Sequence, residues 1–335
     1  MWHRQVCAAV CTLNQWSLDF TGNLKRILKS TAYSLADDRN LGITGIAIAY
    51  KRGARIRVGA ELEISGYMCQ DHFFELDTEF HSWEVLAEIV KKSNDYQNMV
   101  IVTGMPIRLN VELYNCAVVI QNGLILLIKP KMRFCDHGAY YENRYFVRWQ
   151  KPKEIVDFRL PILENCAVAF GDAILKTSDG VSIGVELCEE LFAWSAFHFC
   201  IGQLPVVWTG AVLPDEHPLA IVKFVLSYID LAQNGVDIVC NPSASFHVLG
   251  NSDHRINNLI MESTAKAGGI CLYSNFRGCD GERVFYDGGS AIAQNGQLYA
   301  RIPQFDIEDV CVATATLDLT RNIAFRASNT SLLTE

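Results

Sequence analysis

The sequence predicts an α/β fold in which two β-sheets are stacked and covered by helices on their outer faces. Short apolar runs with strand character recur along the 335 residues, and segments with helical spacing of apolar residues lie between them. The pairs Asn122-Gly123 and Asn295-Gly296 each divide two apolar runs, a pattern typical of hairpins with primed turns. Mixed strands alternating with helices favour a layered α/β sandwich.

The predicted strands are β-rich, largely apolar runs. They cover residues 5–13, 55–64, 100–107, 116–128, 166–175, 182–188, 236–240, 269–274, 290–300 and 310–319.

The predicted helices lie at 23–34, 82–92 and 253–266. In the first, Leu24, Ile27 and Leu28 recur at helical spacing, and in the second Val85 and Ile89 do so. Each of these helices therefore has one apolar face that can cover a sheet.

Composition predicts a single large cytoplasmic domain. Half of the residues are hydrophobic and the net charge is -8, which disfavours nucleic acid or an anionic membrane as the partner. Met1-Trp-His-Arg4 leads straight into a strand pattern, and the 12 cysteines show no disulfide spacing. Cys7 and Cys11 are expected on one buried strand face, and no metal site is expected.

Cys188 is the first candidate catalytic residue. It follows the apolar run 182–187 at a predicted strand-to-helix elbow, where a helix N-terminus is expected to lower the thiol pKa. A structural role is the alternative, because most cysteines in a reduced protein are small buried hydrophobes.

Two charged residues upstream favour catalysis at Cys188. Glu61 and Lys131 each follow a strand-like run, so three strand ends could meet at one pocket. A thiol nucleophile needs a base to take its proton and a donor to stabilise an oxyanion.

The order Glu61, Lys131, Cys188 resembles the triad of the nitrilase, or carbon-nitrogen hydrolase, superfamily. Flanking motifs resemble the N-terminal glutaminase domain of eukaryotic glutamine-dependent NAD(+) synthetases, over nearly the whole chain. These motifs are Asn14-Gln-Trp16, Glu61-Leu-Glu-Ile-Ser-Gly-Tyr67, Asp71-His-Phe-Phe-Glu75, Pro130-Lys-Met132, Cys188-Glu-Glu-Leu-Phe192 and Cys279-Asp-Gly-Glu-Arg-Val-Phe-Tyr-Asp-Gly288. The resemblance implies an αββα sandwich.

It also implies hydrolysis of the side-chain amide of glutamine through a thioester on Cys188. Glu61 would be the base, Lys131 would stabilise the oxyanion, and Glu142 would be a supporting acid. Glu63 competes with Glu61, since strand alternation puts both on one face, although the family motif favours Glu61. The alternative for Glu142 is an exposed loop carboxylate.

The resemblance assigns glutamine binding to Tyr67, Phe192 and Ser245, with core aromatics and a loop serine as alternatives. His137 and Asn251 replace a tyrosine and an arginine of some bacterial relatives, so the site for the glutamine α-carboxylate is not carried over. Arg255 is a candidate to compensate.

The expected organisation is one carbon-nitrogen hydrolase domain over 1–335, with atypical insertions at about 33–49 and 193–228. The pyrophosphate loop Ser-Gly-Gly-x-Asp-Ser of the synthetase domain is not in the sequence. We therefore expect ammonia production here without a cofactor, while ATP and Mg belong to a separate synthetase domain or subunit.

The predicted function is thus glutamine hydrolysis that supplies ammonia for amidation of deamido-NAD, in a chain expected to form homo-oligomers. Two other classes stay open. One is a carbon-nitrogen hydrolase acting on another amide or nitrile, and the other is a catalytically dead interaction module of the same fold.

Overall fold

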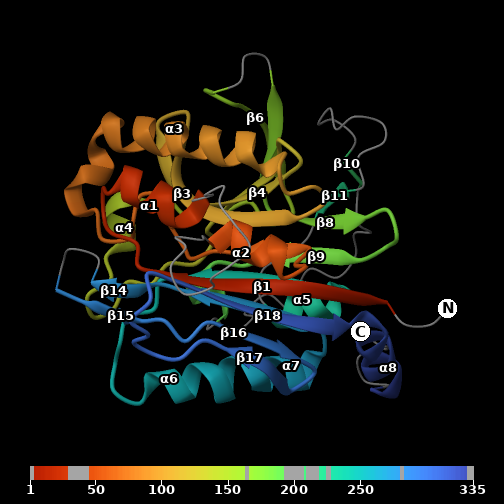
Figure 1. Cartoon of the computed structure of the whole chain (residues 1–335). Coiled ribbons are helices and arrows are strands. Elements are labelled where there is room, and N and C mark those ends of the chain that lie inside the picture. Colours follow the sequence, from red (N-terminus) through yellow and green to blue (C-terminus); the bar gives the residue numbers. More distant parts are fainter. Residues whose placement is uncertain are drawn as a thin grey trace.

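The computed structural model describes residues 4–28, 45–162, 166–191, 207–208, 219–223, 228–279 and 283–329. The described strands form two eight-stranded sheets and one small two-stranded sheet. The large sheets lie one above the other with helices on both outer sides (Figure 1). The predicted αββα sandwich is confirmed.

The first sheet has the strand order β18-β1-β2-β3-β4-β5-β7-β6. Its strands are β1 (Gln5–Leu13), β2 (Ile56–Val58), β3 (Val100–Leu109), β4 (Glu112–Gln121), β5 (Leu124–Pro130), β6 (Ile155–Arg159), β7 (Ala167–Gly171) and β18 (Val310–Asp318).

The second sheet has the order β10-β11-β8-β9-β12-β13-β16-β17, and β14 pairs with β15 in the small sheet. These strands are β8 (Ala173–Thr177), β9 (Ser182–Val185), β10 (Val207–Trp208), β11 (Leu219–Lys223), β12 (Ile238–Ser243), β13 (Ile270–Asn275), β14 (Arg277–Cys279), β15 (Phe285–Asp287), β16 (Ala291–Gln294) and β17 (Gln297–Arg301).

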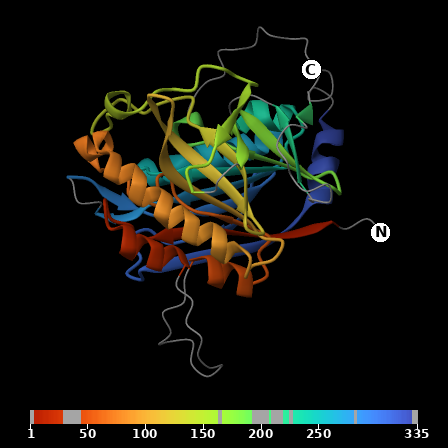
Figure 2. The same ribbon diagram turned by 90° about the horizontal axis from the view of Figure 1, so that it is seen from above.

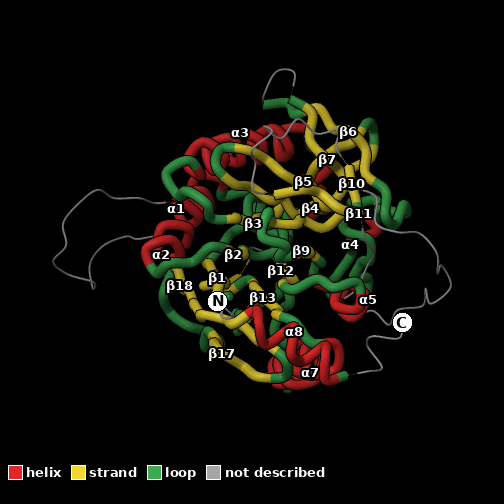
Figure 3. The backbone as a smooth tube through the Cα atoms, turned by 90° about the vertical axis from the view of Figure 1, so that its right-hand side faces the viewer, coloured by secondary structure: helices red, strands yellow, loops and turns green. Residues whose placement is uncertain are grey.

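Helices cover both sheets, and α3 lies diagonally across the strands when the molecule is seen from above (Figure 2). One group, α1 (Phe20–Leu28), α2 (Gly45–Lys51) and α3 (Leu76–Ser93), covers the first sheet. The opposite group is α5 (Tyr228–Gln233), α6 (Asn251–Asp253), the π-helix η3 (His254–Met261) and α7 (Glu262–Ala267), and Figure 3 shows the two groups on either side of the strands. The remaining helices are η1 (Gln70–Phe74), α4 (Glu142–Tyr145), η2 (Cys188–Leu191) and α8 (Leu319–Ser328).

Strand alternation in β1 builds two of the three apolar layers. Ala8 and Val10 face the second sheet, while Ala9 and Cys11 face the helices α1 to α3. A strand buried on both faces reads as a continuous apolar run, which explains the composition of residues 5–13.

Both predicted hairpins are confirmed. Asn122 and Gly123 have φ of 49° and 77° and join β4 to β5, while Asn295 and Gly296 have φ of 49° and 79° and join β16 to β17. Positive φ at both turn residues is the geometry that asparagine and glycine tolerate best.

The strand predicted at 55–64 is wrong beyond Val58. The chain turns after β2, and Leu62 adopts a left-handed φ of 48°. Gly104 of β3 permits this turn, because a Cβ there would lie 2.4 Å from the backbone N of Leu62. The predicted helices are present with shifted bounds, and the second begins at Leu76 rather than at residue 82.

The predicted insertions contribute to the sandwich where they are described. Residues 29–44 lie outside the described residues, but α2 packs Ile46 and Ala49 against the first sheet. Within 193–228, β10 and β11 extend the second sheet beyond β8, and most of the other residues are outside the described part. No helix in the described ranges is long and apolar enough to cross a membrane.

Candidate active site

Four sequence-predicted residues lie at strand ends of both sheets. Glu61 follows β2, Lys131 follows β5, Cys188 follows β9, and Ser245 follows β12. The backbone N of Glu61 donates to the carbonyl of Ser243 at 3.3 Å, which links the two sheets at this point. The candidate site is therefore assembled across the sheet interface.

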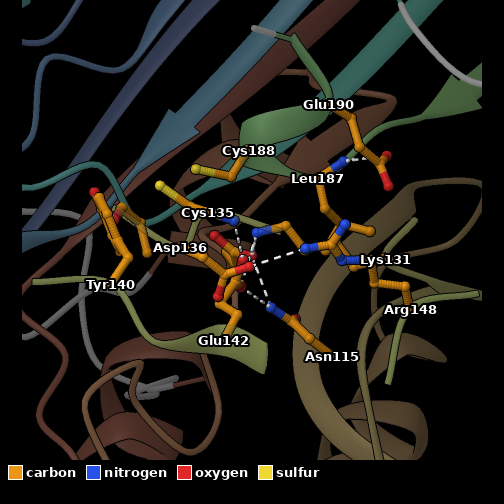
Figure 4. A network of polar contacts seen from close by, with 12 residues as sticks. Asn115, Lys131, Cys135, Asp136, Tyr140, Glu142, Arg148, Leu187, Cys188 and Glu190 are labelled. Carbon is orange, nitrogen blue, oxygen red and sulfur yellow. Dashed lines mark hydrogen bonds and ion pairs between the residues drawn. The ribbon is translucent and has the colours of Figure 1, made fainter. Parts of the chain in front are cut away.

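Lys131 is the centre of a buried ionic network (Figure 4). Its Nζ lies 2.5 Å from Glu61 Oε1 and 2.8 Å from Glu142 Oε1, and all three side chains are buried. Asn115 donates to the same two oxygens at 2.7 and 3.0 Å. The backbone N of Cys135 donates to the other oxygen of Glu142, so the loop alternative for Glu142 is wrong.

Protonation of this network depends on burial and charge together. Burial raises the pKa of Glu61 to about 7, although Lys131 opposes the shift, and the charge of Glu142 adds to it. Burial would lower the pKa of Lys131, but Glu142 and Glu61 hold it well above its usual value. Lys131 is thus a permanent cation beside a carboxyl group that can exchange a proton near neutrality.

The geometry separates Glu61 from Glu63. Arg57 binds Glu63 through both guanidinium nitrogens, at 2.6 and 2.7 Å, and Thr103 donates to it at 2.9 Å. Glu61 Oε2, by contrast, is buried without a hydrogen-bond partner among the described residues. The two side chains do not share a face, because residues 61–65 form turns rather than a strand.

Cys188 begins the short helix η2 and has a positive φ of 43°. The strand-to-helix elbow is present, with β9 ending at Val185. The thiol is buried, and its Sγ lies 3.8 Å from Ser245 Oγ. A strained backbone at a buried thiol between two strand ends is typical of a functional site.

The predicted low pKa of Cys188 is not found. Burial raises the pKa to about 12, the charge of Glu61 adds to the shift, and Lys131 opposes it. A helix of four residues supplies too small a dipole to outweigh the loss of water. The thiol is therefore neutral at rest and needs a base to react.

Sequence analysis missed two polar residues of the site. Asn115 bridges Glu61 and Glu142 from β4, and nothing in its sequence context distinguishes it. Glu190 accepts hydrogen bonds from the backbone N of Leu187 at 2.9 Å and of Met132 at 2.6 Å. The second acidic residue of Cys188-Glu-Glu was its only sequence signal.

A cavity of about 520 Å³ approaches the network from the side of Tyr67 and Glu142. Both residues line it, as do Arg144 and Arg283, whereas Cys188 is not in its wall. Tyr67 also packs edge-on against Tyr140 and Tyr286. The cavity therefore reaches Glu142 of the buried network, while the thiol of Cys188 is not exposed to it.

The other predicted binding residues are only partly placed. Ser245 lies beside Cys188 and accepts a hydrogen bond from Tyr273 at 3.2 Å, while Phe192 is outside the described residues. Arg255 is buried and lies 2.5 Å from Asp287, so its charge is already neutralised. His137 is exposed, and neither it nor Asn251 nor Arg255 lines the cavity.

Comparison with known proteins agrees with this geometry. The carbon-nitrogen hydrolase profile matches residues 7–196. The chain is 40% identical over 333 residues to the human glutamine-dependent NAD(+) synthetase and 39% identical over 328 residues to that of Saccharomyces cerevisiae. These two matches cover 98% and 96% of this chain but only 40% and 39% of the relatives' own lengths.

Solved structures show the same fold. A glutamine-dependent NAD(+) synthetase from Cytophaga hutchinsonii matches with a TM-score of 0.72 at 23% identity, covering 94% of this chain and 43% of that one. An amidase from Nesterenkonia AN1, of the nitrilase superfamily, matches with a TM-score of 0.60 at 15% identity, covering 98% of this chain and 95% of that one. The family profile covers more than half of the sequence, and the chain belongs to the carbon-nitrogen hydrolase family.

Proposed function

We propose that the chain hydrolyses the side-chain amide of glutamine and supplies the ammonia to an NAD(+) synthetase reaction. The observation that carries the proposal is the buried contact of Lys131 with Glu61 and Glu142, next to a neutral thiol. The chain's 40% identity to proteins named glutamine-dependent NAD(+) synthetase supports glutamine as the substrate.

In the first step, Glu61 takes the proton of Cys188 while the sulfur adds to the amide carbon. Because the resting thiol is neutral, proton removal and attack must be coupled. The oxyanion that forms accepts hydrogen bonds from Lys131 and from the backbone N–H of Glu189, next to the nucleophile.

In the second step, Glu61 gives its proton to the departing nitrogen, and ammonia leaves a thioester on Cys188. Glu61 then removes a proton from water, which attacks the thioester, and gives that proton to the departing Cys188 sulfur, so that glutamate leaves and the thiol and the ionised Glu61 are restored. A pKa near 7 suits Glu61 to both directions of proton transfer. Neither step uses a cofactor.

The ammonia would be used by a synthetase domain or subunit that activates deamido-NAD with ATP and Mg. The relatives are about two and a half times as long as the part that this chain matches, since it spans 40% of the human relative. We also propose that the chain forms a homo-oligomer and that it acts in the cytoplasm.

A second candidate is hydrolysis of another small amide. The chain covers 95% of the Nesterenkonia AN1 amidase, and a solved structure of that amidase has the acetamide moiety of fluoroacetamide attached to its active site cysteine. At 15% identity, the likeness to this amidase shows a shared fold and not a shared substrate. The substrate must therefore be identified by measurement.

Labelling of Cys188 tests the proposal. The purified chain is treated with diazo-oxo-norleucine, with and without excess glutamine, and each cysteine peptide is followed by mass spectrometry. We expect an adduct on Cys188 that glutamine suppresses, and none at this position in Cys188→Ala. An adduct that acetamide suppresses but glutamine does not would favour the amidase. No adduct on a folded chain would contradict both functions and favour the interaction module.

A further inference from the structure

Cys135, His137 and Glu189 form a cluster beside the catalytic network, and the mechanism uses none of their side chains. One ligand atom from each lies within 4.8 Å of the others. Cys135 Sγ is 3.5 Å from His137 Nδ1, and Glu189 reaches the same space from η2. It is the single such group of three or more potential ligands among the residues that the structure describes.

We propose that this cluster is a zinc site and that a zinc ion bound there blocks Cys188. No metal site was expected from the sequence, since no second pair of cysteines or histidines matches Cys7 and Cys11 at a zinc-finger spacing. Glu189 completes the set from a segment more than 50 residues away, which only the fold brings near.

The donor atoms suit zinc. A thiolate, an imidazole nitrogen and a carboxylate oxygen are the three ligand types that zinc binds in proteins, and three protein ligands plus one open position are a common arrangement. Bond lengths around a tetrahedral zinc separate neighbouring ligand atoms by about 3.6 Å. The Cys135–His137 pair already has this spacing, and Glu189, whose ligand atom lies within 4.8 Å of the other two, needs to move by at most about 1 Å.

The surroundings also favour a cation. Half-buried Glu189 brings a carboxylate close to the buried sulfur of Cys135. A divalent ion bound there would replace the thiol proton of Cys135 and neutralise the carboxylate of Glu189. His137 is exposed while Cys135 is buried, so the cluster runs from the surface inwards and offers a path of entry.

Blocking of Cys188 follows from the positions of the ligands. Glu189 is the next residue after Cys188 in the short helix η2, so one zinc ligand lies directly beside the nucleophile in the chain. Figure 4 shows the side chains of Cys135 and Cys188 in the same part of the site. A zinc ion held by Glu189 would therefore lie close to Cys188 and hinder the access of an amide substrate to its thiol.

Metal binding is measured first, and this readout does not depend on glutamine. The full chain is freed of metal with a chelator, then titrated with zinc chloride in a calorimeter and with cobalt(II) in a spectrometer. We expect one ion per chain and a sulfur-to-cobalt charge-transfer band. Cys135→Ser, His137→Gln and Glu189→Gln should each weaken zinc binding by more than about tenfold.

Two control variants test whether zinc binding depends on the three cluster residues. Cys166→Ser and His72→Gln change a partly buried cysteine and an exposed histidine away from the cluster, and both should bind zinc as the unmodified chain does. The Cys135→Ser chain keeps the backbone N–H that binds Glu142, so the catalytic network retains its hydrogen bond. No zinc uptake, or equal uptake by all variants, would overturn the site.

Alkylation by iodoacetamide, followed peptide by peptide, tests the block. One equivalent of zinc should slow labelling of Cys135 and Cys188 at least tenfold in the unmodified chain, and should leave Cys188 labelling unchanged in His137→Gln. Zinc uptake without protection of Cys188 would refute the block. The effect on glutamine turnover rests on the proposed function, whereas binding and alkylation stand even where glutamine is not the substrate.

Discussion

Glu190 accepts a hydrogen bond from the backbone N of Met132 at 2.6 Å, across a sequence separation of 58 residues. Its other oxygen accepts from Leu187 at 2.9 Å. One buried carboxylate therefore fixes the segment that carries Lys131 to the elbow that carries Cys188.

We expect Glu190→Ala to lower kcat about 10- to 100-fold, because two buried backbone N–H groups lose their acceptor and the relative position of Lys131 and Cys188 is no longer fixed. Glutamine turnover and urea unfolding measure the two effects. Glu84→Gln, at an exposed position on α3, is the control. A fully active Glu190→Ala chain would show that the two segments are held by other contacts.

Replacing Lys131 by methionine should abolish turnover and lower the free energy of unfolding by about 3–5 kcal/mol, because Glu61 and Glu142 would remain buried without their cation. Urea denaturation at pH 7.5 measures the loss. The double variant Glu61→Gln, Lys131→Met should be more stable than Lys131→Met alone. If it were less stable, the lysine would not be neutralising Glu61.

The rate of Cys188 inactivation by diazo-oxo-norleucine should rise with pH around an apparent pKa near 7. Glu61 is a base only when ionised, and burial raises its pKa to about 7, so the rate falls as pH falls through this value. The value belongs to the coupled network of Glu61, Lys131 and Glu142. In Glu61→Gln the dependence near 7 should disappear. A rate that stays constant down to pH 5 would contradict a role for Glu61 as base.

Glu186 predicts a separate pH effect on stability. Burial, then the charge of Glu190, raises the pKa of Glu186 to about 8, and Asn241 donates to it at 3.2 Å. Between the usual glutamate pKa and about pH 8, Glu186 is protonated in the folded chain and ionised in the unfolded chain. The free energy of unfolding therefore falls as the pH rises through this range. The slope is at most about 1.4 kcal/mol per pH unit.

In Glu186→Gln this part of the pH dependence should be lost. We expect a smaller drop in Tm between pH 6 and pH 8.5 than in the unmodified chain, measured by differential scanning calorimetry. Glu262→Gln, on the exposed side of α7, should behave as the unmodified chain. An unchanged drop in Glu186→Gln would assign the effect to other groups.

Much of the fold could be predicted because local signals agree with the final structure. The apolar run 5–13 became β1 with the expected bounds, and both Asn-Gly pairs became hairpins. The turn at 59–65 could not be predicted, since it depends on Gly104 of another strand allowing close approach.

In the candidate site, too, some features could be predicted from local sequence and others could not. The strand ends near Lys131 and Cys188 were visible in the sequence, whereas the strand predicted at 55–64 ran past Glu61. The fold places Glu61 beside Lys131. Asn115 and the pKa of Cys188 were not predictable. Both depend on burial by residues distant in sequence, and a local helix-dipole argument does not account for that burial.

The pairing of β1 with β18 has a consequence for biosynthesis. Leu13 pairs with Val310, so one of the two neighbours of the first strand is made almost 300 residues later, whereas the other, β2, follows early. At the usual speed of a ribosome this takes on the order of tens of seconds, during which the edge of β1 that will pair with β18 is open to wrong partners. A chaperone that covers residues 5–13 of the nascent chain would protect it until translation passes Asp318.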